Sequence, residues 1–95
     1  MRRRARTDSN HAEIVEALRR AGCTVQSLAA IGDGTPDLLV GYGGRNLLVE
    51  VKDGAKSPSR RRLTPDESTW HTAWAGQVAV ASTVAEALAV IRERP

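Results

Sequence analysis

The chain has 95 residues, which is enough for one domain with a small hydrophobic core. No apolar run approaches the roughly 20 residues of a membrane-spanning helix, and no apolar segment follows the basic N-terminus as in a secretory signal. The one cysteine, Cys23, excludes an internal disulfide and fits a reducing cytoplasm.

Positive charge is concentrated in two segments of the chain. Fourteen basic residues against eleven acidic ones give a net charge of +3. Residues 1–7 are expected to form a flexible basic arm, and a second basic run lies within residues 54–62. Such runs favour partners that carry phosphate, although a solvated tail and a solubilising loop explain either run equally well. The basic residues are Arg2, Arg3, Arg4, Arg6, Lys56, Arg60, Arg61 and Arg62.

The first helix is expected to begin after Asp8 or Ser9, both good N-cap residues, and to end before Gly22. Of its carboxylates only Glu13 lies at the edge of the apolar stripe, where it could turn inward. A solvated carboxylate near the helix N-terminus is an equally good interpretation of this residue. Residues 24–28 alternate like a short strand, and a glycine-containing loop follows.

Residues 36–52 are typical of a two-stranded hairpin. Two apolar runs flank the dipeptide 43–44, Gly-Gly, which readily takes the positive φ angles of a two-residue turn. With these glycines at the centre of the turn, Asp37 pairs with Glu50 across the strands. Side chains alternate along a strand, so Lys52 lies on the same face as Glu50.

This register brings two carboxylates and an ammonium group into one patch on otherwise apolar strands. Adjacent carboxylates repel each other, and charges are costly to bury without a partner. A hard divalent cation, Mg²⁺ or Mn²⁺, would relieve the conflict. A salt bridge between Lys52 and one carboxylate is the structural alternative, but it does not explain why Asp37 and Glu50 converge.

Residues 53–62 are predicted to be a loop that precedes a second helix. Thr64 at the N-cap and Glu67 three positions later form a capping box. Trp70 and Trp74 follow at helical spacing, and we expect them to pack against the sheet, with stacking on a nucleic-acid base as the alternative.

Residues 77–81 are predicted to be a strand, and a last helix begins after Thr83. The expected order is helix, strand, two-stranded hairpin, helix, strand, helix. The hairpin is antiparallel and the crossover to residues 77–81 is parallel, so the sheet is mixed, with helices on both faces. The fold class is therefore α/β, as one domain over residues 8–95.

Two other kinds of site are excluded. The glycines at positions 41, 43 and 44 lack the third glycine and the helix of a dinucleotide-binding loop. His11 and His71 have no metal-ligand spacing with Cys23 or with each other, so a zinc site is not expected.

The motifs GDGTPDLLV, LLVEVKDG and LTPDE with the following WH and W, in this order, resemble the VRR-NUC family. These virus-type replication-repair nuclease domains belong to the PD-(D/E)xK superfamily. The resemblance covers about residues 8–92 and implies a restriction-endonuclease-like αβββαβ core, in agreement with the order expected from the residues themselves.

The resemblance also implies roles for individual residues. Asp37 and Glu50 would be metal ligands, with the Val51 carbonyl as a third, and Lys52 would position or activate the attacking water. Glu13 would match the upstream acidic residue near the metal. A further position, Glu67, departs from the family, which has glutamine there, so a water-mediated metal contact and a purely capping role both remain open.

The function implied is a Mg²⁺- or Mn²⁺-dependent DNA endonuclease that hydrolyses phosphodiester bonds. A structure-specific enzyme that resolves four-way (Holliday) junctions in recombination and repair, as a homodimer, is the expected form. Its implied location is the cytoplasm of a bacterial or phage-infected cell. The alternative is a non-catalytic nucleic-acid-binding module, or an accessory subunit, that retains the nuclease fold.

Overall fold

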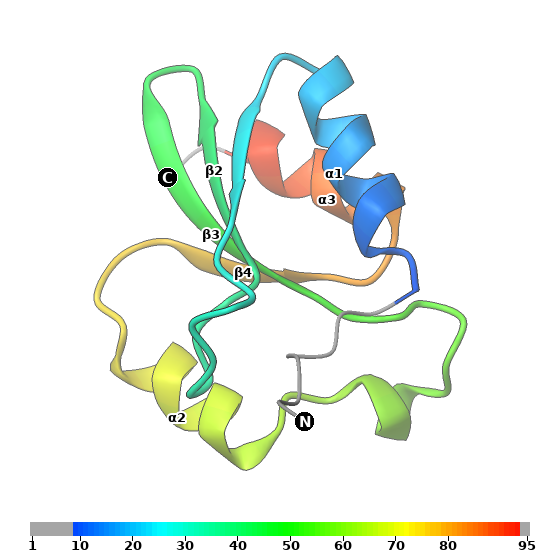
Figure 1. Ribbon diagram of the computed structural model, residues 1–95, viewed down its shortest axis with the longest axis vertical. Coiled ribbons are helices and arrows are strands. Elements are labelled where there is room, and N and C mark those ends of the chain that lie inside the picture. The colour runs from blue at the N-terminus through cyan, green and yellow to red at the C-terminus, as the bar shows by residue number, and fades with distance from the viewer. Residues whose placement is uncertain (1–8, 94–95) are drawn as a thin grey trace.

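A mixed four-stranded sheet forms the centre of the computed structural model, which describes residues 9–93 (Figure 1). The predicted basic arm, with Arg2, Arg3, Arg4 and Arg6, lies outside these residues. The elements in chain order are α1 (His11–Arg20), β1 (Thr24–Ser27), β2 (Leu38–Tyr42), β3 (Arg45–Val51), the 3₁₀ helix η1 (Pro58–Arg61), α2 (Pro65–Ala73), β4 (Val78–Ala81) and α3 (Val84–Arg92). The predicted order and the α/β class are confirmed.

The strand order in the sheet is β1-β2-β3-β4, with antiparallel pairing up to β3 and parallel pairing between β3 and β4. In the hairpin, Tyr42 pairs with Arg45 and Leu38 pairs with Val49, which is the predicted register. The turn glycines at positions 43 and 44 have φ angles of 58° and 80°. Continued by one position, this register places Asp37 opposite Glu50.

The hydrophobic core lies between one face of the sheet and the helices α1 and α3. The buried side chains of the core come from alternate strand positions and from one stripe of each helix. They are Ile14, Leu18, Cys23, Leu38, Val40, Leu47, Val49, Val51, Ala81, Ala87 and Ile91. Because alternate residues point away from this core, Leu39, Leu48 and Val80 lie on the opposite face, and Val80 is 39% exposed.

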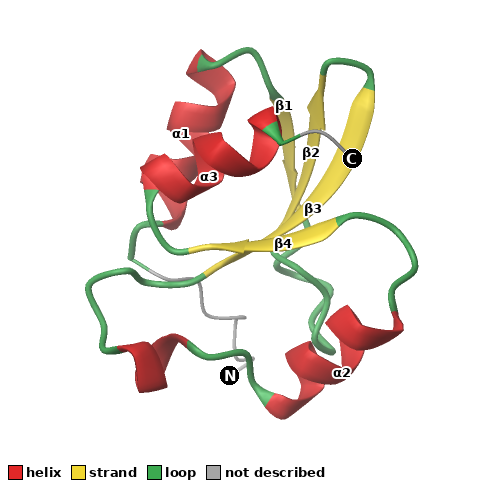
Figure 2. Cartoon of the chain, turned by 180° about the vertical axis from the view of Figure 1, so that it is seen from behind, coloured by secondary structure: helices red, strands yellow, loops and turns green. Residues whose placement is uncertain are grey.

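The expectation of helices on both faces is wrong. Helix α2 has no buried residue and lies beyond the end of the sheet instead of across its second face (Figures 1 and 2). Its sequence, PDESTWHTA, has no apolar stripe comparable with those of α1 and α3. No helix among residues 9–93 has the length and apolar character needed to cross a bilayer.

The start of α1 also differs from the prediction. Asn10 occupies the N-cap position without a capping side-chain hydrogen bond, and the helix begins at His11. Ser9 Oγ donates to Asp53 Oδ2 (3.1 Å), and Asn10 Nδ2 donates to the carbonyls of Lys52 (3.1 Å) and Ser82 (2.8 Å). The polar side chains before α1 therefore tie the helix to the segments that follow β3 and β4.

The predicted loop at residues 53–62 contains a single turn of 3₁₀ helix. Pro58 occupies its first turn, and Arg60 N donates to Ser57 O at 2.9 Å. Proline suits this position because its fixed φ fits the first turn and its missing N–H would have no partner there. The segment thus has local order that its Gly/Ser/Pro composition did not predict.

The loop between β1 and β2 packs against the beginning of α2 (Figures 1 and 2). Gly32, Asp33 and Gly34 all have positive φ, at 73°, 57° and 81°. A Cβ at Gly34 would lie 2.5 Å from the carbonyl oxygen of Asp66, whereas a Cβ at Gly32 would meet nothing within 4 Å. Close contact at Gly34 therefore holds the loop and α2 together beside Asp37.

Alanine substitutions at Gly32 and Gly34 distinguish the cost of backbone strain from the cost of a steric clash. Gly32→Ala should lower the free energy of unfolding by about 1–2 kcal/mol, the cost of a left-handed non-glycine residue. Gly34→Ala should cost clearly more, because its methyl group must also displace the Asp66 carbonyl. Urea unfolding of both variants measures the difference, and equal losses would show that the contact with α2 is not tight.

Candidate functional site

The end of the hairpin brings Asp37 and Glu50 together, as the register predicts. Asp37 precedes β2, and its Oδ2 accepts a hydrogen bond from Val51 N at 2.8 Å. The carbonyl oxygen of Asp37 accepts from Leu28 N at 2.7 Å. Hydrogen bonds thus hold both the backbone carbonyl and the side-chain carboxylate of Asp37, and the carboxylate lies against the strand that carries Glu50.

Glu50 is the most buried carboxylate of the site. Its side chain follows the alternation of β3 away from the hydrophobic core, yet the residue is only 3% exposed. Its Oε1 is buried and receives no N–H or O–H donor from the described part of the chain. Burial, together with the charges of Asp37 and Glu67, raises the pKa of Glu50 to about 9, although the charge of Lys52 acts to lower it. Without a bound cation, Glu50 therefore holds a proton at neutral pH.

Asp37 is affected in the same direction. Burial raises its pKa, and the hydrogen bond from Val51 N only partly opposes this effect. Glu50 lies within hydrogen-bonding reach of both Asp37 and Glu67. Two carboxylates can share a hydrogen bond only through a proton, so the arrangement favours protonation of one of them.

Lys52 lies between Glu50 and Glu67 and is bonded to the second. Its Nζ is 2.7 Å from Glu67 Oε1 and 3.7 Å from Glu50 Oε2, and its side chain is 12% exposed. The predicted salt-bridge alternative for Lys52 is therefore partly correct, but its closest carboxylate comes from α2 and not from the hairpin.

Glu67 both caps helix α2 and forms an ion pair with Lys52. Its Oε1 accepts from Thr64 N at 2.9 Å, while Thr64 Oγ1 accepts from Glu67 N at 3.2 Å, which completes the predicted capping box. Burial acts to raise the pKa of Glu67, but the hydrogen bond from Lys52 and the Thr64 N–H outweigh it, and the pKa is lowered. The sequence predicted the cap; the ion pair with Lys52 joins α2 to β3.

The two interpretations of Glu13 left open by the sequence, a residue turned inward and a solvated one, can be compared with its position. It is exposed on α1 and lines a hollow of about 530 Å³ with Asn10, Asp53 and Ser82 among other residues. Burial is the largest cause of the raised pKa of Asp37 and of Glu50, and Glu13 is not among the charged groups that act on either carboxylate. The solvated interpretation of Glu13 fits this position better.

The central basic residues precede α2. Lys56, Arg60 and Arg62 are exposed and Arg61 is partly buried, on the segment that connects Lys52 to the N-cap of α2. Their charges therefore lie close in sequence to both Lys52 and Glu67. The terminal arginines of the predicted phosphate-binding set lie outside the described residues.

Two histidines that sequence reasoning excluded as ligands lie beside the carboxylates. The charge of His11 lowers the pKa of Asp37, and the charge of Glu67 acts to raise that of His71, although burial lowers it overall. His11 Nδ1 and His71 Nε2 are buried without a hydrogen-bond partner among residues 9–93. For His71 a signal existed, because its i, i+4 spacing from Glu67 places both on one face of α2.

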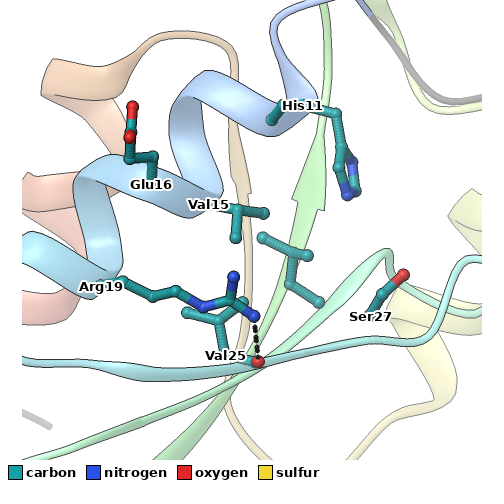
Figure 3. Close-up of a pocket in the computed structure, with 8 residues that line it drawn as sticks. His11, Val15, Glu16, Arg19, Val25 and Ser27 are labelled. Carbon is teal, nitrogen blue, oxygen red and sulfur yellow. Dashed lines mark hydrogen bonds between the residues drawn. The ribbon is translucent and has the colours of Figure 1, made fainter.

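His11 also borders a hollow of about 530 Å³ between α1 and β1 (Figure 3). Val15, Val25 and Leu38 supply apolar lining, and Arg19 Nη2 donates to Val25 O at 3.1 Å. Figure 3 shows Arg19 and His11 at opposite ends of this hollow. The hollow lies on the helix-covered side of the sheet, and neither Lys52 nor Glu67 lines it.

The carboxylate oxygens of the site are ligands that a hard cation prefers, but their arrangement is not that of a complete metal site. No group of three or more His, Cys, Asp or Glu side chains in the described chain has the arrangement of a metal site. Asp37 and Glu50 nevertheless supply carboxylate oxygens, and Glu50 Oε1 is a buried acceptor with no donor. Oxygen ligands of this kind suit Mg²⁺ or Mn²⁺, with water completing the coordination.

Comparisons of the chain with protein-family models, with curated proteins and with solved structures gave no match.

The raised pKa of Glu50 predicts a pH-dependent stability. Between pH 7 and 9 the folded protein keeps a proton on Glu50 that the unfolded chain, with a pKa near 4.5, has released. The free energy of unfolding should therefore fall as pH rises, by up to about 1.4 kcal/mol per pH unit. Urea unfolding in metal-free buffer measures this slope, which Glu50→Gln should largely remove.

Glu16→Gln is the matched control, because the Glu16 side chain is 67% exposed. This variant should keep the wild-type slope. A slope that persists in Glu50→Gln would contradict the prediction, because it would assign the retained proton to another group such as Asp37.

Proposed function

We propose that the chain is a metal-dependent DNA endonuclease that hydrolyses phosphodiester bonds, with the restriction-endonuclease-like fold of the VRR-NUC family. The observation that carries this proposal is the convergence of Asp37, Glu50 and Lys52 at one end of the sheet. A purely structural ion pair needs one carboxylate, whereas this site crowds a second, buried carboxylate against the first. The resemblance of the sequence motifs to that family supports the same function.

In this proposal Asp37 and Glu50 hold Mg²⁺ or Mn²⁺, and the Val51 carbonyl is the third candidate ligand. The cation would supply Lewis-acid chemistry, because it neutralises phosphate charge and makes water more acidic. Loading the site requires Glu50 to lose the proton that its pKa of about 9 retains. Metal affinity should therefore increase with pH.

Lys52 is the candidate for stabilising negative charge on the phosphate and for orienting the attacking water. Its Nζ is held at 2.7 Å by Glu67, and the capping box fixes Glu67 in turn. Glu67 therefore acts as a positioning residue for the ammonium group in this proposal. Preorganised charges of this kind contribute strongly to catalysis because they need not reorient during the reaction.

DNA is the proposed substrate because the segment that joins Lys52 to helix α2 is rich in exposed basic residues. Lys56, Arg60, Arg61 and Arg62 lie between Lys52 and α2, where they could contact the phosphates on either side of the bond to be cut. The terminal arginines would add to this contact. Cleavage would depend on DNA structure, with a four-way junction as the proposed substrate.

Resolution of a four-way junction requires two coordinated cuts, so we propose that the active form is a homodimer. The sheet face opposite the core carries Leu39, Leu48, Val78 and Val80, with no helix of the described chain packed across it. A second copy would shield this apolar face from water.

The nuclease proposal predicts that Lys52→Ala abolishes cleavage of a labelled four-way junction in Mg²⁺ or Mn²⁺. The rate should fall at least about a hundredfold, as for loss of one preorganised charge-stabilising group. Arg20→Ala is the matched control: it removes an exposed basic side chain of α1 that belongs to no part of the proposed site, and cleavage should continue at the wild-type rate. Electrophoresis of the cleaved strands measures both variants, with EDTA as the metal-free reference.

Wild-type protein that binds the junction but cuts no DNA with any divalent cation would contradict the nuclease proposal. One observation favours that second function, a non-catalytic nucleic-acid-binding module: Lys52 is already paired with Glu67 at 2.7 Å. Metal binding provides an independent check of the site. Mg²⁺ or Mn²⁺ should raise the melting temperature of the wild type at pH 8 but not that of Asp37→Asn.

The dimer proposal predicts a mass twice that of the 10.2 kDa chain in sedimentation equilibrium at micromolar concentration. Burial of the apolar sheet face would drive the association, so high salt should not abolish it. A monomer mass, both free and with a junction bound, would contradict paired cutting.

A further inference from the structure

Two tryptophans form an aromatic stack at the end of α2. The ring centroids of Trp70 and Trp74 are 4.5 Å apart, and the ring planes differ by 17°. Trp70 is partly buried, but 48% of Trp74 is exposed, so the expectation that Trp74 packs against the sheet is wrong. Tryptophan combines a large apolar ring with one polar N–H, and for this reason it is enriched at binding interfaces.

The stack extends from the carboxylate site along the same helix. Glu67, His71 and Trp74 are spaced i, i+4 and i+7, which places them on one face of α2. This face is turned toward the site, because Glu67 contacts Lys52 and the charges of both residues act on His71. Seven helical residues correspond to roughly 10 Å, or about three steps of stacked bases at 3.4 Å each.

The indole of Trp74 is held in position by its neighbours. Trp70 covers one of its faces, and the edge of His71 contacts Trp70 with centroids 6.2 Å apart. At Gly76 a Cβ would lie 2.9 Å from Trp74 Nε1, so a glycine here lets the backbone approach the ring edge. The ring is thus fixed while nearly half of its surface remains open.

The basic residues before α2, together with the aromatic surface of Trp74, suit a nucleic-acid ligand. Exposed Arg60 and Arg62 precede the N-terminus of the helix, and Trp74 lies at its C-terminus. Cations that follow a phosphate backbone, together with an aromatic ring on which bases stack, are the two components of single-strand nucleic-acid sites. Glu67, which pairs with Lys52 of the carboxylate site, lies between them along the chain.

We propose that Trp74, supported by Trp70, is a stacking site for an unpaired or unstacked nucleobase of DNA beside the phosphate to be cut. This inference rests on the proposed nuclease function and deepens it, because it specifies the substrate as DNA with a base free to leave the helical stack. Every base has a π-face, so the site selects an accessible base and not a sequence. A base inside an intact duplex has both faces covered by its neighbours and gains nothing from the indole.

Binding without cleavage tests this site directly. Fluorescence anisotropy in EDTA compares the affinity of the protein for an intact duplex, the same duplex with a short single-stranded bulge, and a four-way junction. Trp74→Leu, which keeps apolar bulk but lacks a ring, should weaken binding to the bulged duplex about tenfold or more and leave the intact duplex unchanged. Trp74→Phe should restore most of the loss.

Thr72→Ala is the matched control, because Thr72 lies on the other side of α2, beside a separate hollow formed with Ser68 and Thr69. Its affinity for all three DNAs should equal that of the wild type. Quenching of tryptophan emission by the bulged DNA gives a second readout, which Trp74→Leu should reduce. Far-UV circular dichroism checks that each variant keeps the fold.

Equal affinity of Trp74→Leu and wild type for the bulged duplex would overturn the inference, as would an equal loss on intact and bulged DNA. A change of oligomeric mass in Trp74→Leu, with DNA affinity unchanged, would assign the stack to a protein interface and also overturn the inference.

The nuclease proposal and the stacking proposal can fail separately. Bulge-specific binding through Trp74 without cleavage would refute only the nuclease, and cleavage that ignores Trp74 would refute only the stacking site.

Discussion

The burial of Glu50 among other acidic groups is the constraint around which this end of the molecule is arranged. Its neighbours on β3, Val49 and Val51, are each 1% exposed and belong to the hydrophobic core. Strand alternation then forces Glu50 onto the opposite face, where Asp37 and Glu67 surround it. The same seven-residue strand therefore stabilises the fold on one face and carries a destabilising carboxylate on the other.

Helix α2 is best understood as a carrier of side chains rather than as part of the core. It has no buried residue, and it is held by a capping box, by the Lys52–Glu67 ion pair and by the close approach of Gly34 to Asp66. Segments with few buried apolar contacts have low local stability, and functional elements are often found among them. Its aromatic and acidic residues thus lie on an element whose side chains the hydrophobic core does not use.

The parts of the structure that could be predicted from the sequence depend on local rules. The Gly43–Gly44 turn fixes the hairpin register, and the register fixes which side chains meet; Thr64 and Glu67 define the start of α2 in the same way. These rules act over a few residues and leave little freedom. The convergence of Asp37 and Glu50 followed from them without knowledge of the tertiary structure.

What could not be predicted depends on partners distant in sequence. Asn10 bonds the carbonyls of Lys52 and Ser82 instead of capping α1, and no local pattern announces such contacts. The position of His11 beside Asp37 depends on how α1 lies against the sheet, which helical periodicity does not specify. Likewise, the placement of α2 beyond the sheet left Trp74 exposed where its spacing predicted packing.

The charge balance of the site connects Glu67 with the proposed cation. Glutamine at this position would leave Asp37, Glu50 and Lys52 with a net charge of −1 when all are ionised, whereas glutamate brings the group to −2. One divalent cation neutralises that charge, but one proton does not. The proton that Glu50 retains offsets half of that charge when no cation is present. On this reasoning the glutamate favours the proposed cation, although its shortest contact is with Lys52.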